Sequence, residues 1–368
     1  MKFGLFSNGY RVRPVARDSY DEDLHEVVTA DRLGFDEAWV SEHVTLRPDG
    51  LPVPEMFFCK AAALTSHIRF GAAVRLLPVY HPIDVATQAV VCDHLTGGRY
   101  NFGYGSGAPA WWIHEPRGVN IDLRHEMMEE SLEFIIRAWT AEEPFDFDGR
   151  FWQSKRVVVL PKPLQKPYPP MAVATRTEEL LESAGRQGHI WLGSHYFSAP
   201  SFKKLTDTYK AAATKAGQPN PLQHIRAGLA IYLADSVAEA KRDIWEGASA
   251  EMDALAKMVN VPHFRDYVPP PPKRYEDINL EYLIDAGMFY IGDPDTVFEQ
   301  IKNYYLESGG FGGLLIVAGK EWSTREKRDR SMERFMQHVA PRVRDLDLRH
   351  SEQREEFGAT ADASLRSA

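Results

Sequence analysis

Three features of the sequence predict an α/β protein folded as a (β/α)8 TIM barrel. Short apolar runs alternate with longer amphipathic segments, and the alternation gives eight strands. The amino-acid composition does not change along the chain in a way that would indicate a second domain. The chain of 368 residues is 44% hydrophobic, and closed barrels often use about 250 residues or more for one core. We therefore expect one barrel domain over residues 1–345 and a polar C-terminal tail over residues 346–368.

The first half of the chain supplies four predicted strands, at residues 3–6, 35–40, 68–77 and 100–105. Ser19 and Glu22 have the spacing of a capping box, which predicts a helix that starts at Ser19 and ends at Gly34. Pro54 and Pro82 are typical first residues of the next two helices. Apolar residues then recur at helical spacing after the fourth strand: Met128, Leu132, Ile135, Ile136 and Trp139.

The second half supplies the other four strands, at residues 171–174, 189–193, 226–234 and 312–317. Asp293 followed by Pro294 is typical of a helix start, with aspartate as the N-cap. Proline-rich stretches break the alternation twice, which predicts inserted segments near residues 143–170 and 258–288.

Charge and composition exclude several kinds of partner. The formal net charge of −9 provides no positive field for nucleic acid or for an anionic membrane surface, and no run of about 18 apolar residues could span a bilayer. The two cysteines, Cys59 and Cys92, suggest neither a disulfide framework nor a zinc site. The sequence therefore predicts a cytoplasmic protein without a metal site, and it carries neither H-E-x-x-H nor G-x-S-x-G.

In a TIM barrel the chemistry gathers where strands end, and the second predicted strand ends in Ser41, Glu42 and His43. Histidine is suited to proton transfer near neutral pH, and Glu42 could orient or tune it. The alternative interpretation is a hydrogen-bonded pair at the rim of the barrel.

The third and fourth strands end in residues that suit a bound ligand but also have structural interpretations. Arg75 could neutralise an anion, although pairing with a neighbouring carboxylate is the favoured interpretation. Glycines 103, 105 and 107 around Ser106 would let the backbone approach a flat ligand, or they form a tight turn. They do not match the G-x-G-x-x-G fingerprint of a Rossmann fold.

The fifth strand is followed by Thr175, Arg176 and Thr177 just before a predicted helix, where free backbone donors and the helix dipole suit a phosphate. Thr175 and Glu178 also have capping-box spacing, so ordinary helix capping is the alternative.

In this order along residues 1–345, the motifs resemble the bacterial luciferase-like flavin monooxygenase family, in the branch of the diketocamphane and limonene monooxygenases. The resemblance rests on these segments: Glu42-His43, Leu77-Pro78, His81-Pro82, Gly97-Gly98-Arg99-Tyr100, residues 103–107, residues 147–152, the helix containing residues 133–139 and residues 292–297.

The resemblance implies a flavin-dependent monooxygenase that uses reduced FMN, supplied by a separate NAD(P)H-dependent reductase, and dioxygen. It places Glu42 and His43 beside the flavin, with His43 as the proposed catalytic group that donates a proton to the oxygenated flavin or stabilises it. Arg75, Gly105 and Ser106 would bind the flavin ring. Thr175, Arg176 and Thr177 would hold its phosphate, although Arg176 with Glu178 departs from the serine-rich turn more common in the family.

The expected substrate is a small apolar organic molecule. The inserted segments and the aromatic residues Trp111, Trp112, Phe151, Trp152, His263, Phe264 and Tyr267 would either cover the mouth of the barrel or form a subunit interface. A homodimer is implied by the resemblance alone. The alternatives are a deazaflavin-dependent oxidoreductase, or a noncatalytic partner subunit of a luciferase-like complex.

Overall fold

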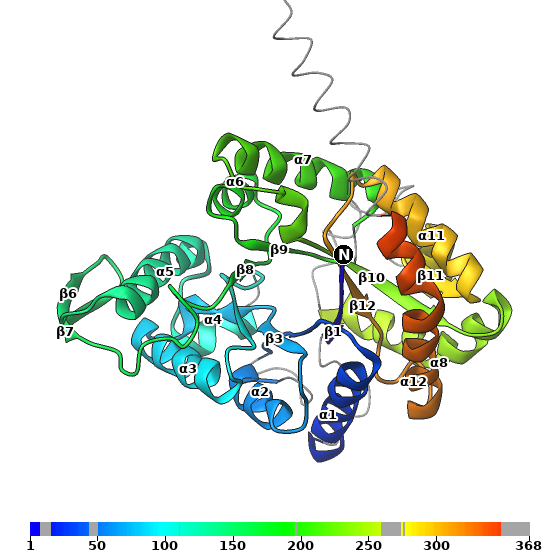
Figure 1. Cartoon of the computed structure of the whole chain (residues 1–368), viewed down its shortest axis with the longest axis horizontal. Coiled ribbons are helices and arrows are strands. Elements are labelled where there is room, and N and C mark those ends of the chain that lie inside the picture. The colour runs from blue at the N-terminus through cyan, green and yellow to red at the C-terminus, as the bar shows by residue number, and fades with distance from the viewer. Residues whose placement is uncertain are drawn as a thin grey trace, which may run out of the picture.

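Eight parallel strands form a closed ring at the centre of the molecule, with helices around it (Figure 1). The computed structural model describes residues 1–7, 16–43, 51–109, 111–195, 197–258, 274 and 277–346. In ring order the strands are β1 (Lys2–Ser7), β2 (Glu37–Val40), β3 (Arg69–Ala72), β5 (Tyr100–Gly105), β8 (Met171–Val173), β9 (Ile190–Gly193), β10 (Ile225–Leu233) and β12 (Gly313–Val317). Pairing of β12 with β1 closes the ring, so the predicted TIM barrel is confirmed.

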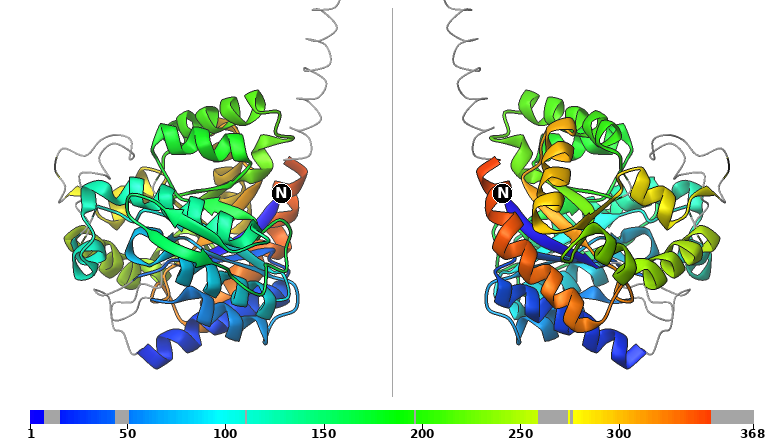
Figure 2. Two further views of the ribbon diagram at one scale, coloured as in Figure 1. Left: turned by 90° about the vertical axis from the view of Figure 1, so that its left-hand side faces the viewer. Right: turned by 90° about the vertical axis from the view of Figure 1, so that its right-hand side faces the viewer.

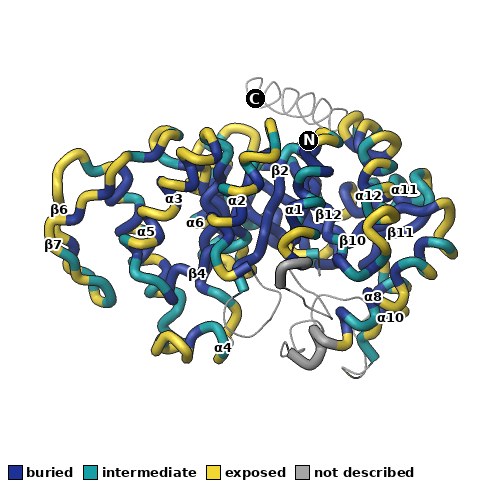
Figure 3. The backbone as a smooth tube through the Cα atoms, turned by 90° about the horizontal axis from the view of Figure 1, so that it is seen from below, coloured by how far each residue is buried: buried dark blue, intermediate teal, exposed yellow. Residues whose placement is uncertain are grey.

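Helices surround this ring and bury its outer face, so the ring strands lie in the darkest part of Figure 3. They are α1 (Ala16–Leu33), α2 (Pro54–Ala62), α3 (Pro82–Leu95), α4 (Trp111–His114), α5 (Arg124–Thr140), α6 (Glu178–Gln187), α7 (Ala199–Lys215), α8 (Val237–Met258), α10 (Leu280–Asp285), α11 (Pro294–Glu307) and α12 (Arg325–Arg334). Figure 2 shows the last described part of the chain, in orange and red, near the blue strand β1, and just after α12 Phe335 packs edge-on against Phe3 of β1 with ring centroids 5.6 Å apart.

The structure differs from the predicted elements in three places. The strand expected at residues 68–77 is divided into β3 and the two-residue strand β4 (Arg75–Leu76), which pairs with β5. Helix α1 starts at Ala16 rather than at Ser19, and it buries Ser19 within the helix, so the capping-box prediction is wrong. An unpredicted strand, β11 (Phe289–Gly292), pairs with the last residues of β10.

The insertion near residues 143–170 contains an antiparallel hairpin, β6 (Phe145–Asp148) and β7 (Gln153–Val157), beside α5 at one edge of the molecule (Figure 1). The Glu130 carboxylate of α5 holds the turn by accepting hydrogen bonds from three successive backbone amides, those of Arg150, Phe151 and Trp152. Most of the insertion near residues 258–288, and all of the expected tail beyond residue 346, lie outside the described residues.

The amino end of the barrel is closed by a matched ion pair. The Glu37 carboxylate, on β2, accepts hydrogen bonds of 2.8 Å from both Nε and Nη2 of Arg226, on β10. A third hydrogen bond, of 2.9 Å, comes from the Trp39 indole. The Arg226 charge holds the pKa of Glu37 at about 2 although burial acts in the opposite direction. This end of the barrel is therefore filled by side chains that satisfy one another.

Candidate active site

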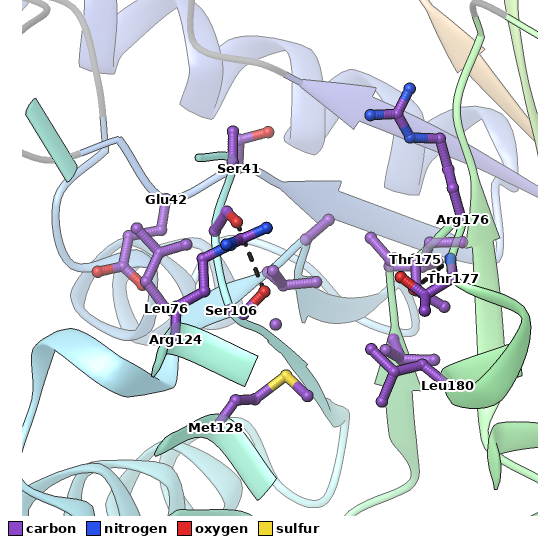
Figure 4. Close-up of a pocket in the computed structure, with 18 of the residues that line it drawn as sticks. Ser41, Glu42, Leu76, Ser106, Arg124, Met128, Thr175, Arg176, Thr177 and Leu180 are labelled. Carbon is purple, nitrogen blue, oxygen red and sulfur yellow. Dashed lines mark hydrogen bonds between the residues drawn. The ribbon is translucent and has the colours of Figure 1, made fainter. Parts of the chain in front are cut away.

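A cavity of about 510 Å³ opens at the carboxyl ends of the strands, where a TIM barrel carries its chemistry (Figure 4). The residues that line it come from the ends of β2, β4, β5, β8 and β9 and from α4, α5 and α6. They are Ser41, Glu42, His43, Ala73, Val74, Leu76, Gly105, Ser106, Gly107, Ala108, Pro109, Ile113, Arg124, His125, Met128, Val173, Ala174, Thr175, Arg176, Thr177, Leu180, Leu192, Ser194 and Phe197. Seven of the eight residues predicted for the site are therefore brought together here.

Glu42 and His43 line the cavity side by side just after β2, as predicted. The Glu42 side chain is buried, and its carboxylate accepts hydrogen bonds from the Tyr80 hydroxyl at 2.5 Å and from the Leu76 amide at 3.0 Å. Burial raises the pKa of Glu42 above its usual value, although the nearby Arg75 charge acts to lower it. A carboxyl group with this bias is a candidate acid.

Arg75 is the one predicted site residue that does not line the cavity. It is 1% exposed and lies behind Glu42, with Nη1 at 3.2 Å from Glu42 and Nε at 3.4 Å from Glu55 on α2. The favoured interpretation, pairing with a neighbouring carboxylate, is what the structure shows. Its role in binding the flavin ring stays a prediction.

Gly105, Ser106 and Gly107 form one wall of the cavity, and the two glycines are required by close packing and by backbone conformation. Gly105 ends β5 in extended conformation, and a Cβ atom there would lie 2.4 Å from Val74. Gly107 has a φ of +78°, which favours glycine. Between them Ser106 is 8% exposed and lines the cavity. The segment is thus a strand end followed by a single left-handed residue rather than a tight turn throughout.

The opposite wall contains Thr175 and Thr177 at the start of α6, across the open space from Glu42 and Ser106 in Figure 4. Thr175 Oγ1 accepts a hydrogen bond of 3.1 Å from the Thr177 amide, while no side chain caps the first turn of α6. Glu178 instead pairs with Lys204 of α7 at 2.8 Å. The capping-box interpretation is therefore wrong, and the first backbone amides of α6 are left for a ligand.

Sequence reasoning missed two polar residues on α5, Arg124 and His125, which line the same cavity (Figure 4). One guanidinium nitrogen of Arg124 donates to the Ile121 carbonyl at 2.8 Å, but its Nε is buried without a hydrogen-bond partner, as is Nδ1 of His125. Burial and the Arg124 charge lower the pKa of His125. The spacing along α5 indicates this position, because Arg124 lies one helical turn before Met128, on the apolar face of the helix.

Four of the seven aromatic residues expected at the mouth do not line the cavity. Trp111, Trp112, Phe151 and Trp152 do not line the cavity, and the Trp152 indole donates to Ser131 on α5 at 2.9 Å. His263, Phe264 and Tyr267 lie outside the described residues. The insertion near residues 143–170 therefore extends the side of the barrel and does not cover this cavity.

The described residues form neither a metal-binding cluster nor a membrane-spanning helix. Within the described ranges no three His, Cys, Asp or Glu side chains are grouped so that they could hold a metal ion. No helix in the part of the chain that the structure describes is long and apolar enough to cross a membrane.

Comparisons with known proteins agree with this geometry. A family model described as luciferase-like monooxygenase matches residues 1–311. Limonene 1,2-monooxygenase of Rhodococcus erythropolis is 30% identical over 92% of this chain and 86% of its own length. The oxygenase component of a flavin-dependent trigonelline monooxygenase from Acinetobacter baylyi is 26% identical over 95% of this chain and 98% of its own.

A solved structure extends the similarity to the fold. The oxygenating constituent of 3,6-diketocamphane monooxygenase from Pseudomonas putida, a type II Baeyer–Villiger monooxygenase in complex with FMN, superimposes with a TM-score of 0.79. It is 27% identical to this chain, and the match covers 93% of this chain and 98% of that one.

Proposed function

The chain belongs to the family of luciferase-like monooxygenases, and on this premise we propose that it uses reduced FMN and dioxygen to oxygenate an apolar organic substrate. One observation carries the proposal. The cavity at the carboxyl end of the barrel joins an acid and a histidine on one wall to an uncapped helix start on the other. A flavin mononucleotide has a flat ring at one end and a phosphate at the other, so it matches both walls.

The residues present fit FMN, on two observations of the cavity. The first backbone amides of α6 have no side-chain cap, and a phosphate would accept their hydrogen bonds beside Thr175 and Thr177. Arg124 has a buried Nε without a partner, so it would supply a positive charge to the same anion. Gly105 and Ser106 give a flat wall on which the ring would lie.

When bound, reduced FMN supplies the electrons that activate dioxygen, and this chain's residues bind, orient and protonate. His43 lines the cavity beside Glu42, so both would be placed to deliver a proton to a flavin bound there. Apolar side chains exclude water from the same space, which limits wasteful release of hydrogen peroxide. These side chains are Val74, Leu76, Ile113, Met128, Leu180, Leu192 and Phe197.

The same apolar lining favours an apolar substrate. The relatives act, by their names, on limonene, diketocamphane and trigonelline, so the ring system that the cavity accepts differs within the family. The relatives described as an oxygenase component and as an oxygenating constituent support a separate reductase, which would deliver reduced FMN from NAD(P)H. We expect this exchange in the cytoplasm.

A homodimer would cover an apolar surface on α2 and α3. Its members are exposed side chains on these helices and just beyond α2: Met56, Leu64, Val91 and Leu95, which are 76%, 55%, 45% and 62% exposed. Sedimentation of the wild type and of Met56→Lys would test this surface, with a dimer expected only for the wild type. A wild-type monomer at micromolar concentration would contradict the proposal.

The decisive experiment for the function is reconstitution. The purified chain is mixed with chemically reduced FMN and dioxygen, with limonene and 3,6-diketocamphane as probe substrates, and mass spectrometry follows incorporation of one oxygen atom from labelled dioxygen. We expect tight binding of reduced FMN and oxygenated product from at least one probe. Failure to bind FMN, or activity only with a reduced deazaflavin, would overturn the proposal.

A further inference from the structure

A buried cluster behind the cavity wall contains more negative than positive groups. Glu42 and Glu55 both lie within ion-pair distance of one guanidinium, that of Arg75, at 3.2 and 3.4 Å. The exposed fractions of the three side chains are 0%, 6% and 1%. If both glutamates were ionised, the cluster would hold one uncompensated negative charge out of contact with water, which is costly.

Burial, and not hydrogen bonding, makes Glu42 the better place for a proton. Arg75 makes contacts of ion-pair length to both carboxylates, but its Nε and Nη1 have no partner with hydrogen-bond geometry among the described residues, and it donates instead to Gln88 at 3.2 Å. Glu42 accepts hydrogen bonds on both oxygens, whereas Glu55 accepts one of 3.0 Å from Tyr100 and its Oε2 is buried without a described partner. Glu42 is the more deeply buried of the two and faces the cavity, so burial penalises its charge the most.

The residue on the far side of Glu42 is Tyr80, whose hydroxyl lies 2.5 Å from its Oε1. Tyr80 is only partly buried, and the guanidinium of the exposed residue Arg117 lies 4.7 Å from the centre of its ring. The Arg75 guanidinium lies 4.4 Å from the centre of the same ring. Tyr80 therefore lies between the buried Glu42 carboxyl group and a part of the surface that water reaches.

We propose that Glu42 holds a proton at neutral pH, gives it to the cavity, and is reprotonated through the Tyr80 hydroxyl. The proton balance is simple. When the Glu42 O–H bond breaks, the carboxylate that remains faces Arg75 and accepts hydrogen bonds from Tyr80 and Leu76. Tyr80 then passes its proton to Glu42 as it takes one from water, so its own charge does not change. The proton on the pair follows from the shared guanidinium, and its place on Glu42 follows from burial. Its use as a donor rests on the proposed function.

Other ionisable groups around the cluster do not cancel its negative excess. His43 follows Glu42 in the chain, Arg117 faces Tyr80, and Tyr100 faces Glu55. Cys59 and Cys92 lie close to each other and to Glu55, and burial raises the pKa of Cys92, while Cys92 Sγ contacts the Glu55 backbone carbonyl at 3.9 Å. The thiols therefore add no positive charge, and Arg75 is the one cation among the described residues that contacts both carboxyl groups.

The test of the protonated state needs no cofactor. Infrared difference spectra of the protein alone, recorded between pH 5 and 9, report the carbonyl stretch of a buried protonated carboxylic acid. We expect this band at neutral pH in the wild type and its loss in Glu42→Gln. The band should remain in Glu37→Gln, the control variant, because Glu37 is also buried but its charge is neutralised by Arg226. Absence of the band in the wild type, or its persistence in Glu42→Gln, would overturn the proposal.

Two further variants test the charge count and the proton route. In Glu55→Gln one carboxylate faces one guanidinium, so the band should disappear at lower pH than in the wild type; a change to higher pH would contradict the charge argument. In Tyr80→Phe the band should remain, because Glu42 loses one hydrogen bond but keeps its burial. Loss of the band in Tyr80→Phe would show that the hydroxyl, and not burial, holds the proton.

The donor role is tested on the loaded enzyme by following the return of oxidised FMN absorbance after reduced FMN meets dioxygen. Glu42→Gln should slow this return by about 100-fold, as expected for loss of a positioned acid, with FMN affinity unchanged. Tyr80→Phe should slow the return of oxidised FMN absorbance less than Glu42→Gln does, and it should increase the solvent isotope effect measured in heavy water. Unchanged rates in both variants would overturn the donor role, whereas failure of the wild type to bind FMN would refute the proposed function and leave the infrared result intact.

Discussion

Strand β2 has a buried glutamate at each end, and the two glutamates differ in how their charges are matched. Glu37, at the amino end, meets one guanidinium, that of Arg226, through two hydrogen bonds of 2.8 Å. Glu42, just beyond the carboxyl end, shares Arg75 with Glu55 through contacts of 3.2 and 3.4 Å. The same two residue types thus make a one-to-one ion pair at one end of the barrel and, at the other, a shared guanidinium beside the glutamate that we propose holds a proton.

The direction of the two pKa values expresses this difference. Arg226 lowers the pKa of Glu37 to about 2, so this glutamate is ionised at neutral pH. Burial raises the pKa of Glu42 in spite of Arg75. Substitutions at the amino end should therefore change the stability of the fold, whereas substitutions at the carboxyl end should change binding and proton transfer.

The largest effect is expected from Arg226→Met, which leaves Glu37 buried without its counter-charge. Breaking a buried pair by removing one partner typically costs about 3–5 kcal/mol, and we expect a loss of that size in the free energy of unfolding measured in urea. The double variant with Glu37→Gln should recover part of it, because the uncompensated charge is gone. A loss below about 1 kcal/mol in Arg226→Met would show that the two ends do not differ as described.

The pH dependence of stability should have opposite sign at the two ends. The pKa of Glu37 falls from 4.5 to about 2 on folding, so its contribution of about 3 kcal/mol is present above pH 4.5 and is lost as the pH falls towards 2. The pKa of Glu42 is raised above 4.5, so its contribution is full below pH 4.5 and is lost as the pH rises.

Urea unfolding of the wild type, Glu37→Gln and Glu42→Gln, measured from acidic to neutral pH, gives the sign of the pH dependence of stability at each glutamate. The advantage of the wild type over Glu37→Gln should grow with pH, and its advantage over Glu42→Gln should shrink. If the stability difference from the wild type changed with pH in the same direction for both variants, the comparison between Glu37 and Glu42 would be contradicted.

The sequence predicted the barrel because strands and helices leave periodic patterns, but it missed what depends on contacts between distant residues. The ends of β2, β5 and β8 could be located from their apolar runs, and Glu42, Ser106 and Thr175 duly line one cavity. Cap spacing was less reliable. Asp293 does cap α11, accepting hydrogen bonds from the Asp295 and Thr296 amides, whereas the same kind of argument failed at Ser19 and Thr175.

The charge matching at the two ends of β2 could not be predicted from one sequence. Glu37 and Arg226 are 189 residues apart, and nothing local indicates that they meet. Glu55 is the second residue of α2 and was not a candidate for the site, yet it shares Arg75 with Glu42. Arg124 was missed for a different reason, because it lies in the first turn of α5 and not at the end of a strand.

A binding experiment sharpens the comparison at the carboxyl end, where Arg124 is not paired with a carboxylate of the residues that the structure describes. Arg124→Met removes the guanidinium whose buried Nε has no partner. A hydrogen bond to a charged group is worth about 1.5–3 kcal/mol, so FMN affinity should fall by about 10- to 100-fold, while riboflavin affinity should change little. Fluorescence titration with both flavins measures this, and unchanged FMN affinity would show that Arg124 serves another ligand group.

The smallest effect is expected from Lys2→Met, which removes a second cation from Glu37. Lys2 Nζ lies 3.3 Å from the carboxylate, but the Lys2 side chain is 51% exposed, so water and salt screen its charge. Arg226 already donates two hydrogen bonds to the same group. We expect a change of about 0–1 kcal/mol in the free energy of unfolding, smaller at high salt. A loss as large as that of Arg226→Met would mean that Glu37 needs both cations, and that the amino end is not a one-to-one pair.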